Sequence, residues 1–239
     1  MNSIRDCARS LAIANNSGAP DTQLLIQAAE IILEDPGFQN LQAKKVGLVV
    51  DQTQKGAGGL DTGSPSPNAW YYIWVIACQT GQTSAVLSLS SDSPTMPPAF
   101  TFKAFVGAIQ TDTSGKFFRF NQVGPVVARN AMAVLQEGAA TVLTPVDCST
   151  ALPKKATKAY GSVGLSANIQ QADPGYGDAW LASKPNQGMI EFRGYLQTGK
   201  FWFSAPFCIP VVESQTLYYE AAPGTNVGGV SVSISAFEF

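Results

Sequence analysis

Turn-forming residues divide this chain into short apolar segments, and their close spacing limits what the chain can fold into more than any other feature. From residue 23 onward, apolar or alternating segments are separated by clusters such as Asp35-Pro36-Gly37 and Gln197-Thr198-Gly199. Segments of this length and spacing are typical of antiparallel strands, because the chain turns back before a long helix can form. The sequence therefore predicts an all-β fold, an antiparallel β-sandwich of jelly-roll-like form with little or no helix.

Apolar patterns in the first half predict strands with different surroundings. Trp70–Cys78 is apolar on both alternating faces, which predicts a central strand covered on both sides. Residues 84–90 alternate between apolar and serine positions, which predicts one dry and one wet face. Residues 23–33 are ambiguous, because the spacing of their polar residues fits a helix whereas the isoleucines and leucine at their end favour a strand.

Two glycine-containing segments are interpreted as connections. Residues 112–115 (DTSG) lie between Phe100–Gln110 and residues 117–123, and this order predicts a hairpin. Residues 55–59 (KGAGG) are rich in glycine but lack the order of a phosphate-binding loop and lead into no helix. We interpret residues 55–59 as a flexible loop.

Gly124-Pro125 is the best candidate for a domain boundary. It divides the chain into a β-sandwich module over residues 1–124 and a second β-sandwich, jelly-roll-like half over residues 125–239, although no long linker separates the two and they could be continuous. Strands are expected in the second half at residues 131–135, 159–169, 189–196, 200–209, 216–220 and 229–239.

The last predicted strand changes register near its end. Val230, Val232 and Ile234 share one face, whereas Phe237 and Phe239 fall in the register of the serines. A β-bulge, or burial of the two rings against another subunit, would explain the change. We expect Phe237, Phe239 and also Pro97, from a proline-rich segment, at the contact of a homo-oligomer, with a trimer favoured.

Charged residues are scarce and balanced. They make up 13% of the chain, against about 25% in typical domains, and the net charge is −2. Neither sign forms a block, so we expect no nucleic-acid binding and no attraction to anionic membranes. The longest apolar run is too short and too aromatic for a membrane-spanning helix, so no membrane insertion is expected. The four cysteines lie far apart without any CxxC motif and are expected to be reduced thiols.

The chain contains no histidine, and this removes most hydrolytic mechanisms. Serine–histidine and cysteine–histidine pairs are absent with it, as is the commonest metal ligand. A glycosidase that uses two carboxylates is still conceivable, with Asp173, Asp178 and Glu191 as candidates, but turn or surface roles suit these residues better. We therefore expect no enzymatic activity, no catalytic residues, no metal and no cofactor.

Residues 170–188 (QQADPGYGDAWLASKPNQG) contain the most suggestive cluster of polar and aromatic residues. Tyr176 and Trp180 lie among Asp173 and Asp178, and aromatic faces beside carboxylates are what saccharide recognition uses. These four residues are the candidates for contact with a receptor or glycan. The alternative, which we favour, is a long connection with Trp180 tucked into the core.

Residues 58–124 resemble a module of tail-fibre-like and other structural proteins of tailed bacteriophages and prophages. The matching segments are GGLDTGS (58–64), AWYYIWVIA (69–77), VLSLSSDSPTMP (86–97) and TFKAFVGAIQTDTSGKFFRFNQVG (101–124). The resemblance continues more weakly upstream, which favours strands near residue 30. Similar proteins often have arginines where this chain has Phe105 and Gln110.

The resemblance implies a β-sandwich protein of the virion, usually oligomeric, with no catalytic residues to transfer. Our leading hypothesis is a tail-associated component on the surface of the phage particle, assembled in the host cytoplasm. It would contribute to host attachment through weak contacts with a host glycan or protein, summed over an oligomer. The alternatives are an architectural role, decorating a capsid or cementing other virion proteins, and a polysaccharide depolymerase.

Overall fold

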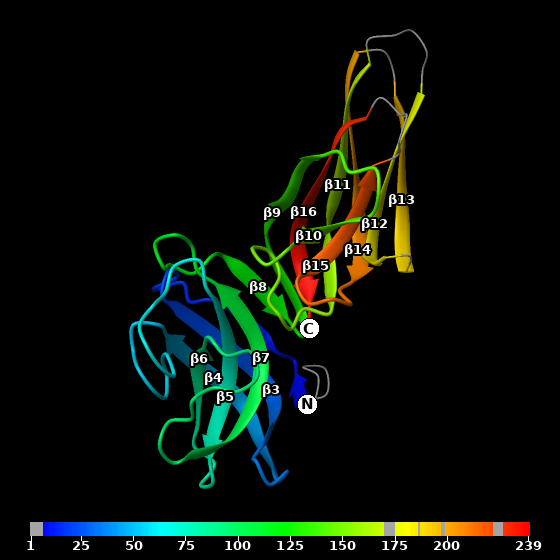
Figure 1. The fold of residues 1–239 in the computed structure, drawn as a ribbon. Coiled ribbons are helices and arrows are strands. Elements are labelled where there is room, and N and C mark those ends of the chain that lie inside the picture. The colour runs from blue at the N-terminus through cyan, green and yellow to red at the C-terminus, as the bar shows by residue number, and fades with distance from the viewer. Residues whose placement is uncertain (1–6, 170–174, 186, 197–198, 222–226) are drawn as a thin grey trace. The chain divides into compact units, whose positions relative to one another are not determined.

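The computed structural model describes residues 7–169, 175–185, 187–196, 199–221 and 227–239, and its elements from Ala8 to Glu238 are all β-strands (Figure 1). The strands pair antiparallel, so the predicted all-β sandwich fold is confirmed. By its internal contacts the chain divides into two compact units, Met1–Arg129 with Phe239, and Asn130–Glu238. The division falls shortly after Gly124-Pro125, and the last residue belongs to the first unit.

The first unit is built around a long, curved run of paired strands. In hydrogen-bonded order these strands are β9-β8-β2-β3-β7-β5-β6, and β1 and β4 pair with β3 as well. Their bounds are β1 (Ala8–Arg9), β2 (Ala12–Asn15), β3 (Gln23–Glu34), β4 (Asn40–Asp51), β5 (Trp70–Cys78), β6 (Thr83–Ser88), β7 (Phe100–Gln110), β8 (Phe120–Val123) and the first residues of β9 (Val126–Gly138).

The ambiguous residues 23–33 form a strand, and the structure explains their helix-like spacing. Leu24, Ile26 and Ala28 are buried with period two, and burial then resumes at Ile31. The pairing of β3 with β4 omits Ala29 and Lys45, which face each other without a change of register, and the backbone φ of Lys45, 51°, is left-handed. This irregularity shifts the buried face by one residue and leaves two buried positions three apart, as on a helix.

Strand β5 is covered on both faces as expected, but β6 differs from its prediction. Ala85, Val86 and Leu87 are all buried, so β6 has no wet face. Residues 56–61 cover it, with Gly58 N donating to Ala85 O (2.8 Å) and Leu87 N donating to Gly59 O (2.9 Å). The glycine-rich segment that we interpreted as flexible therefore satisfies the backbone of an edge strand and shields it.

The predicted hairpin at residues 112–115 forms, but its pairing is short: beyond an antiparallel bridge between Thr111 and Phe117 and a hydrogen bond from Phe118 N to Gln110 O (3.0 Å), it does not continue as a strand ladder. Asp112 accepts hydrogen bonds from the backbone of Ser114 (2.7 Å) and Lys116 (2.9 Å), which closes the turn. Beyond the turn, β8 pairs with β2 and β9 instead of β7. Both edges of β8 are therefore paired with strands other than β7, the partner that the hairpin prediction gave it.

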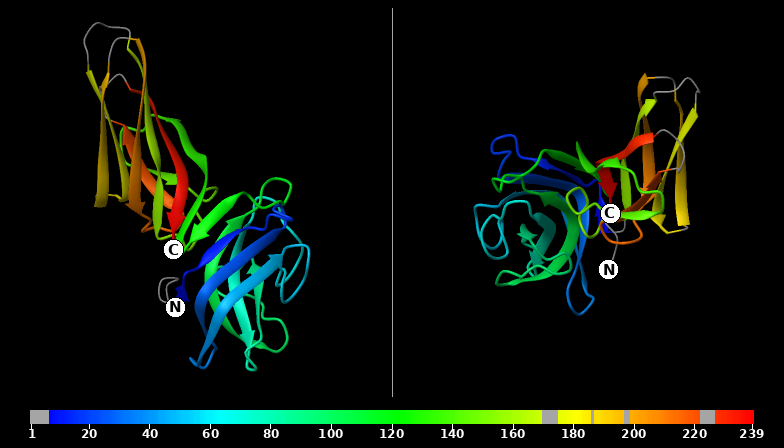
Figure 2. Two further views of the ribbon diagram at one scale, coloured as in Figure 1. Left: turned by 180° about the vertical axis from the view of Figure 1, so that it is seen from behind. Right: turned by 45° about the horizontal axis from the view of Figure 1, so that its top comes forward.

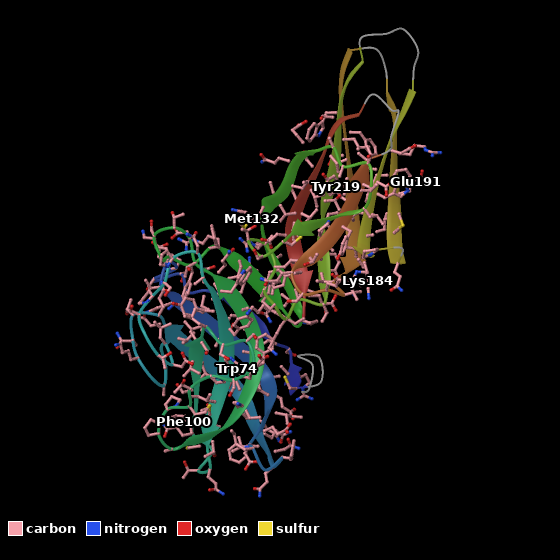
Figure 3. The ribbon with its side chains drawn as sticks, in the orientation of Figure 1. Trp74, Phe100, Met132, Lys184, Glu191 and Tyr219 are labelled. Carbon is pink, nitrogen blue, oxygen red and sulfur yellow. The ribbon has the colours of Figure 1, made fainter. Side chains whose placement is uncertain are left out.

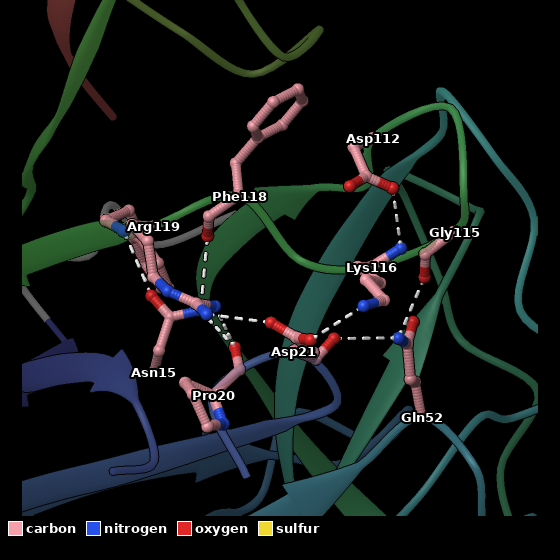
Figure 4. A network of polar contacts seen from close by, with 10 residues as sticks. Asn15, Pro20, Asp21, Gln52, Asp112, Gly115, Lys116, Phe118 and Arg119 are labelled. Atoms are coloured by element: carbon pink, nitrogen blue, oxygen red, sulfur yellow. Dashed lines mark hydrogen bonds and ion pairs between the residues drawn. The ribbon is translucent and has the colours of Figure 1, made fainter.

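A network of polar contacts holds three loops of the first unit together (Figure 4). Asp21 forms ion pairs with Lys116 (3.0 Å) and Arg119 (2.7 Å). The Gln52 side-chain amide donates to Asp21 O (3.1 Å) and to Gly115 O (2.9 Å). These contacts join segments nearly a hundred residues apart in sequence, so they stabilise tertiary structure and not a local turn.

We expect Asp21→Asn to lower the melting temperature modestly at pH 7 and to have a smaller effect near pH 2.5. Hydrogen bonds from Arg119 and Lys116 hold the pKa of Asp21 below its ordinary value. Because the pKa of Asp21 is lower in the folded state than in the unfolded state, its ionised carboxylate stabilises the fold at pH values above the unfolded pKa of about 3.9. This stabilisation is lost as the pH falls through the folded pKa. The change is modest because the pair is exposed. Thermal unfolding of both proteins at the two pH values measures it, and a constant difference would contradict it.

The positions that depart from the phage-like pattern have defined contacts. Phe105 packs edge-on against Trp74, with ring centroids 5.5 Å apart, and Gln110 Oε1 accepts from Arg129 Nη1 (3.0 Å). The Arg129 guanidinium also lies over the ring of Trp70, 5.6 Å from its centroid. Burial lowers the pKa of Arg129 to about 10, which still leaves it charged at neutral pH. A positive charge therefore lies beside Gln110, but it belongs to Arg129 of β9 and not to residue 110 itself.

The second unit is a two-sheet sandwich (Figure 2). One sheet has the order β14-β11-β16-β9, with the later residues of β9, and the other has the order β10-β15-β12-β13. Their bounds are β10 (Thr144–Asp147), β11 (Lys158–Ile169), β12 (Gly175–Lys184), β13 (Gln187–Leu196), β14 (Gly199–Pro210), β15 (Thr216–Ala221) and β16 (Val227–Glu238). Among the described residues, no helix has the length and apolar character needed to cross a membrane.

A β-bulge explains the register change at the end of the chain. Tyr160 pairs with Ala236 and Gly161 with Ile234, so Ser235 is an extra residue in β16. The bulge turns Phe237 inward, where it is 0% exposed, and Phe239 is also buried, with its ring 5.1 Å from that of Phe105. This burial corrects the expectation that both rings lie at a subunit contact. Pro97 is half-buried, and its role in an oligomer stays a prediction.

Candidate binding face of the second unit

The segment interpreted as a long connection contains a strand that the sequence analysis missed. Most of residues 170–188 belong to β12 and to the start of β13, and Asp173 lies outside the described residues. Ala179, Leu181 and Ser183 are buried with strand periodicity, and Ala182 is buried as well. The flanking glycines and prolines hid this alternation, which is the signal that could have found the strand.

The alternation of β12 puts two of the predicted contact residues on one side of the sheet. Asp178 and Trp180 are two residues apart, and so share the face opposite the buried Ala179 and Leu181, whereas the side chain of Tyr176 lies outside the described part of the chain. Across the β12–β13 ladder Asp178 pairs with Arg193 and Trp180 with Glu191. We call the face formed by Asp178, Trp180, Glu191, Arg193 and Glu220 the outer face of β12–β13.

Arg193 organises the charges of this face. Its Nε donates to Asp178 Oδ1 (2.7 Å) and its Nη2 donates to Glu191 Oε1 (2.8 Å). Arg193 and Glu191 are 58% and 46% exposed, and Glu191 projects from the edge of the unit in Figure 3. Exposed pairs contribute little stability, so their main effect is to fix the direction of the side chains.

Trp180 does not lie in the core, which corrects the interpretation that we favoured. It is half-buried on the outer face, and its neighbours across the ladders are Glu191 on β13 and Glu220 on β15. The inner positions are taken by Ala179 and Leu181. The indole is therefore held between two carboxylate-bearing positions, with part of its surface open to solvent.

Tyr218 on β15 extends the polar character of the same sheet. It pairs with Ala182 of β12, and its hydroxyl donates to Glu213 Oε2 (2.7 Å). This hydrogen bond to Glu213 raises the pKa of Tyr218 above its ordinary value. The tyrosine is thus a neutral donor at neutral pH. Arg193, Glu220 and Tyr218 were not identified from sequence, because only the strand pairing brings them beside Trp180.

The outer face is suited to recognition more than to proton transfer. Asp178 and Glu191 both bind the Arg193 guanidinium, whereas a two-carboxylate glycosidase needs one acid that can donate a proton to the substrate. Within the described residues no group of three or more acidic, cysteine or histidine side chains could hold a metal ion. Aromatic surface with fixed hydrogen-bond donors and acceptors is what saccharides and polar peptides bind.

The fold and this face define a class, an all-β protein of two antiparallel units with an aromatic and charged sheet surface. No protein family model matches the chain, and no curated protein matches it either.

Proposed function

We propose that this protein is a structural component of a tailed-phage particle, exposed on a tail-associated surface, and that it contributes to host attachment without catalysis. The observation that carries the proposal is Trp180, half-buried on a sheet face and flanked by Asp178, Glu191 and Glu220. A ring fixed in a strand presents its surface with little loss of conformational entropy on binding. Its ligand would be a host saccharide or a polar segment of a host surface protein.

Two further observations support a structural role in a particle. The segments that resemble phage modules, residues 58–124, include most of the segment 56–61 that covers β6, and they form strands β5 to β8 of the first unit. The chain is also poor in charge, at 13%, and a surface covered by neutral polar groups loses less free energy when it is desolvated against other subunits. Weak contacts on each protomer would be summed by oligomerisation, with a trimer favoured.

We expect Trp180→Ala to weaken binding to host cells or to an array glycan by about 30-fold, because a central tryptophan at an interface contributes about 2 kcal/mol. The matched control is Trp202→Ala on β14, which removes another tryptophan, 60% exposed, from the other sheet. The measurement is binding of purified protein at fixed oligomeric state, determined by light scattering. Equal losses in both variants would contradict the assigned face. Binding only to particles that lack the protein would instead favour the decoration role.

A further inference from the structure

The first unit contains a cavity of about 360 Å³ at the end where the β3–β4 turn faces β7. Its floor is apolar and includes Ile32, Trp74 and Phe105. The rings of Trp74 and Phe105 meet edge to face, and Phe105 also contacts Phe239 at 5.1 Å. This volume lies in the range of small-ligand sites, which is about 300–1,000 Å³. The floor is a rigid aromatic surface, because its rings pack against one another.

The rim of the cavity carries more negative than positive charge. Glu34, Asp35 and Asp92 line it, together with the ammonium group of Lys103, the one cation among the described lining residues. Lys103 Nζ is directed by a hydrogen bond to Ser93 Oγ and lies 5.7 Å from the centroid of the Trp74 ring. The balance of these charges favours a ligand with a cationic group, and Lys103 adds a donor for a ligand oxygen.

Phe38 lies at the rim of the cavity, and its side chain packs against little of the protein. It is 82% exposed, and its backbone φ of 62° lies in the left-handed region that non-glycine residues rarely occupy. The turn is held by Asp35, whose Oδ1 accepts from Gly37 N (2.9 Å) and Gln39 N (2.8 Å). This turn accounts for the backbone conformation of Phe38, and it presents the exposed ring at the rim of the cavity, where the ring offers an aromatic face to a ligand.

Trp74, which lines the cavity, contributes an indole N–H group that makes no hydrogen bond within the described residues. The residue is 3% exposed, and its Nε1–H is buried without a hydrogen-bond partner among the described residues. A buried donor without an acceptor is unfavourable by about 1–3 kcal/mol. An oxygen on a bound ligand would remove that penalty where it reaches the indole.

We propose that this cavity binds a single amino-sugar ring. The ammonium group would lie among Glu34, Asp35 and Asp92, the apolar face of the pyranose would stack on Phe38, and the hydroxyls would meet Lys103 and the amide of Asn40, which also lines the cavity. Donors and acceptors around an aromatic surface match a polyhydroxylated ring that carries one positive charge. This site uses none of the residues of the outer face of β12–β13, and it goes beyond the attachment role proposed above.

The test compares three pyranoses that differ in charge, D-glucosamine, D-glucose and D-glucuronate, by ligand-observed NMR titration at pH 6. We expect glucosamine to bind about tenfold more tightly than glucose, glucuronate not to bind, and added salt to weaken the glucosamine complex. Equal affinity for glucosamine and glucose, tighter binding of glucuronate, or no binding of any of the three at millimolar concentrations would overturn the proposal.

Variants locate the binding. Phe38→Ala and Glu34→Gln should each reduce glucosamine affinity at least fivefold, and both side chains are outside the core, so the fold should persist in circular dichroism spectra. The control is Val123→Ala, which shortens another exposed apolar side chain (72% exposed) away from the cavity and should leave affinity unchanged. Trp180→Ala should also leave glucosamine affinity unchanged, which separates this site from the outer face. Loss of affinity in Val123→Ala, or full affinity in both cavity variants, would refute the assignment.

Discussion

Replacing Gly161 with alanine will destabilise the second unit by about 3 kcal/mol, the upper part of the range for overpacking a core. Gly161 lies in β11 beside the bulge of β16, and a Cβ there would be 1.9 Å from the carbonyl oxygen of Ser233 and 2.9 Å from the ring of Phe207. The carbonyl oxygen belongs to the backbone of a paired strand. It can move only if the ladder between β11 and β16 is distorted.

Gly164→Ala on the same strand is the matched control, with an expected loss below about 1 kcal/mol. A Cβ at Gly164 would also be close to a neighbour, at 2.9 Å, but that neighbour is the end of the Trp202 side chain, which is 60% exposed and can rotate outward. Urea unfolding followed by circular dichroism measures both free energies of unfolding. Similar losses in the two variants would show that the backbone contact is not the cause.

The second large effect is expected for Lys158→Met, with a loss of about 3 kcal/mol, the lower end for breaking a buried ion pair. Glu238 is 4% exposed, and its Oε2 accepts from Lys158 Nζ (3.0 Å) and from the Tyr160 hydroxyl (2.7 Å). Removing the lysine takes one positive charge away from a buried carboxylate. The lower end applies because Lys158 is itself 35% exposed, so solvent already screens part of the pair.

Two further variants separate charge from hydrogen bonding at this position. Tyr160→Phe removes one donor to the same oxygen and should lower the free energy of unfolding by about 1.5 kcal/mol. The double variant Lys158→Met with Glu238→Leu removes both charges and should recover most of the loss, because no unpaired charge stays buried. A double variant less stable than Lys158→Met alone would mean that packing at Glu238 matters more than its charge.

The strands of the first unit were largely predictable because their apolar patterns are local. Trp70–Cys78 is apolar on both faces, and the structure places it as β5 between β6 and β7. In β3 the helix-like spacing came from a shift of the buried face opposite Lys45, which cannot be recognised before the partner strand is known. The same is true of β6, where the covering segment of residues 56–61 comes from earlier in the chain.

The candidate site was predictable only in part. Asp178 and Trp180 were selected for their chemistry, and the structure places both on the outer face of β12–β13. Arg193 and Glu220 join them through pairings across β13 and β15, and sequence proximity does not reveal these pairings. The cavity beside Phe38 was not foreseen, because its lining comes from five separate parts of the first unit.

The residues alone determined the fold class, since turn-forming residues at short intervals and period-two apolar segments permit strands and exclude long helices. They also determined that histidine-based chemistry is absent. Tertiary structure decided which strands pair, where the bulge turns Phe237 into the core, and which side chains share a surface. The physical reason is that backbone hydrogen bonds between strands are nearly independent of side-chain identity, so packing between distant segments selects the partner and the register.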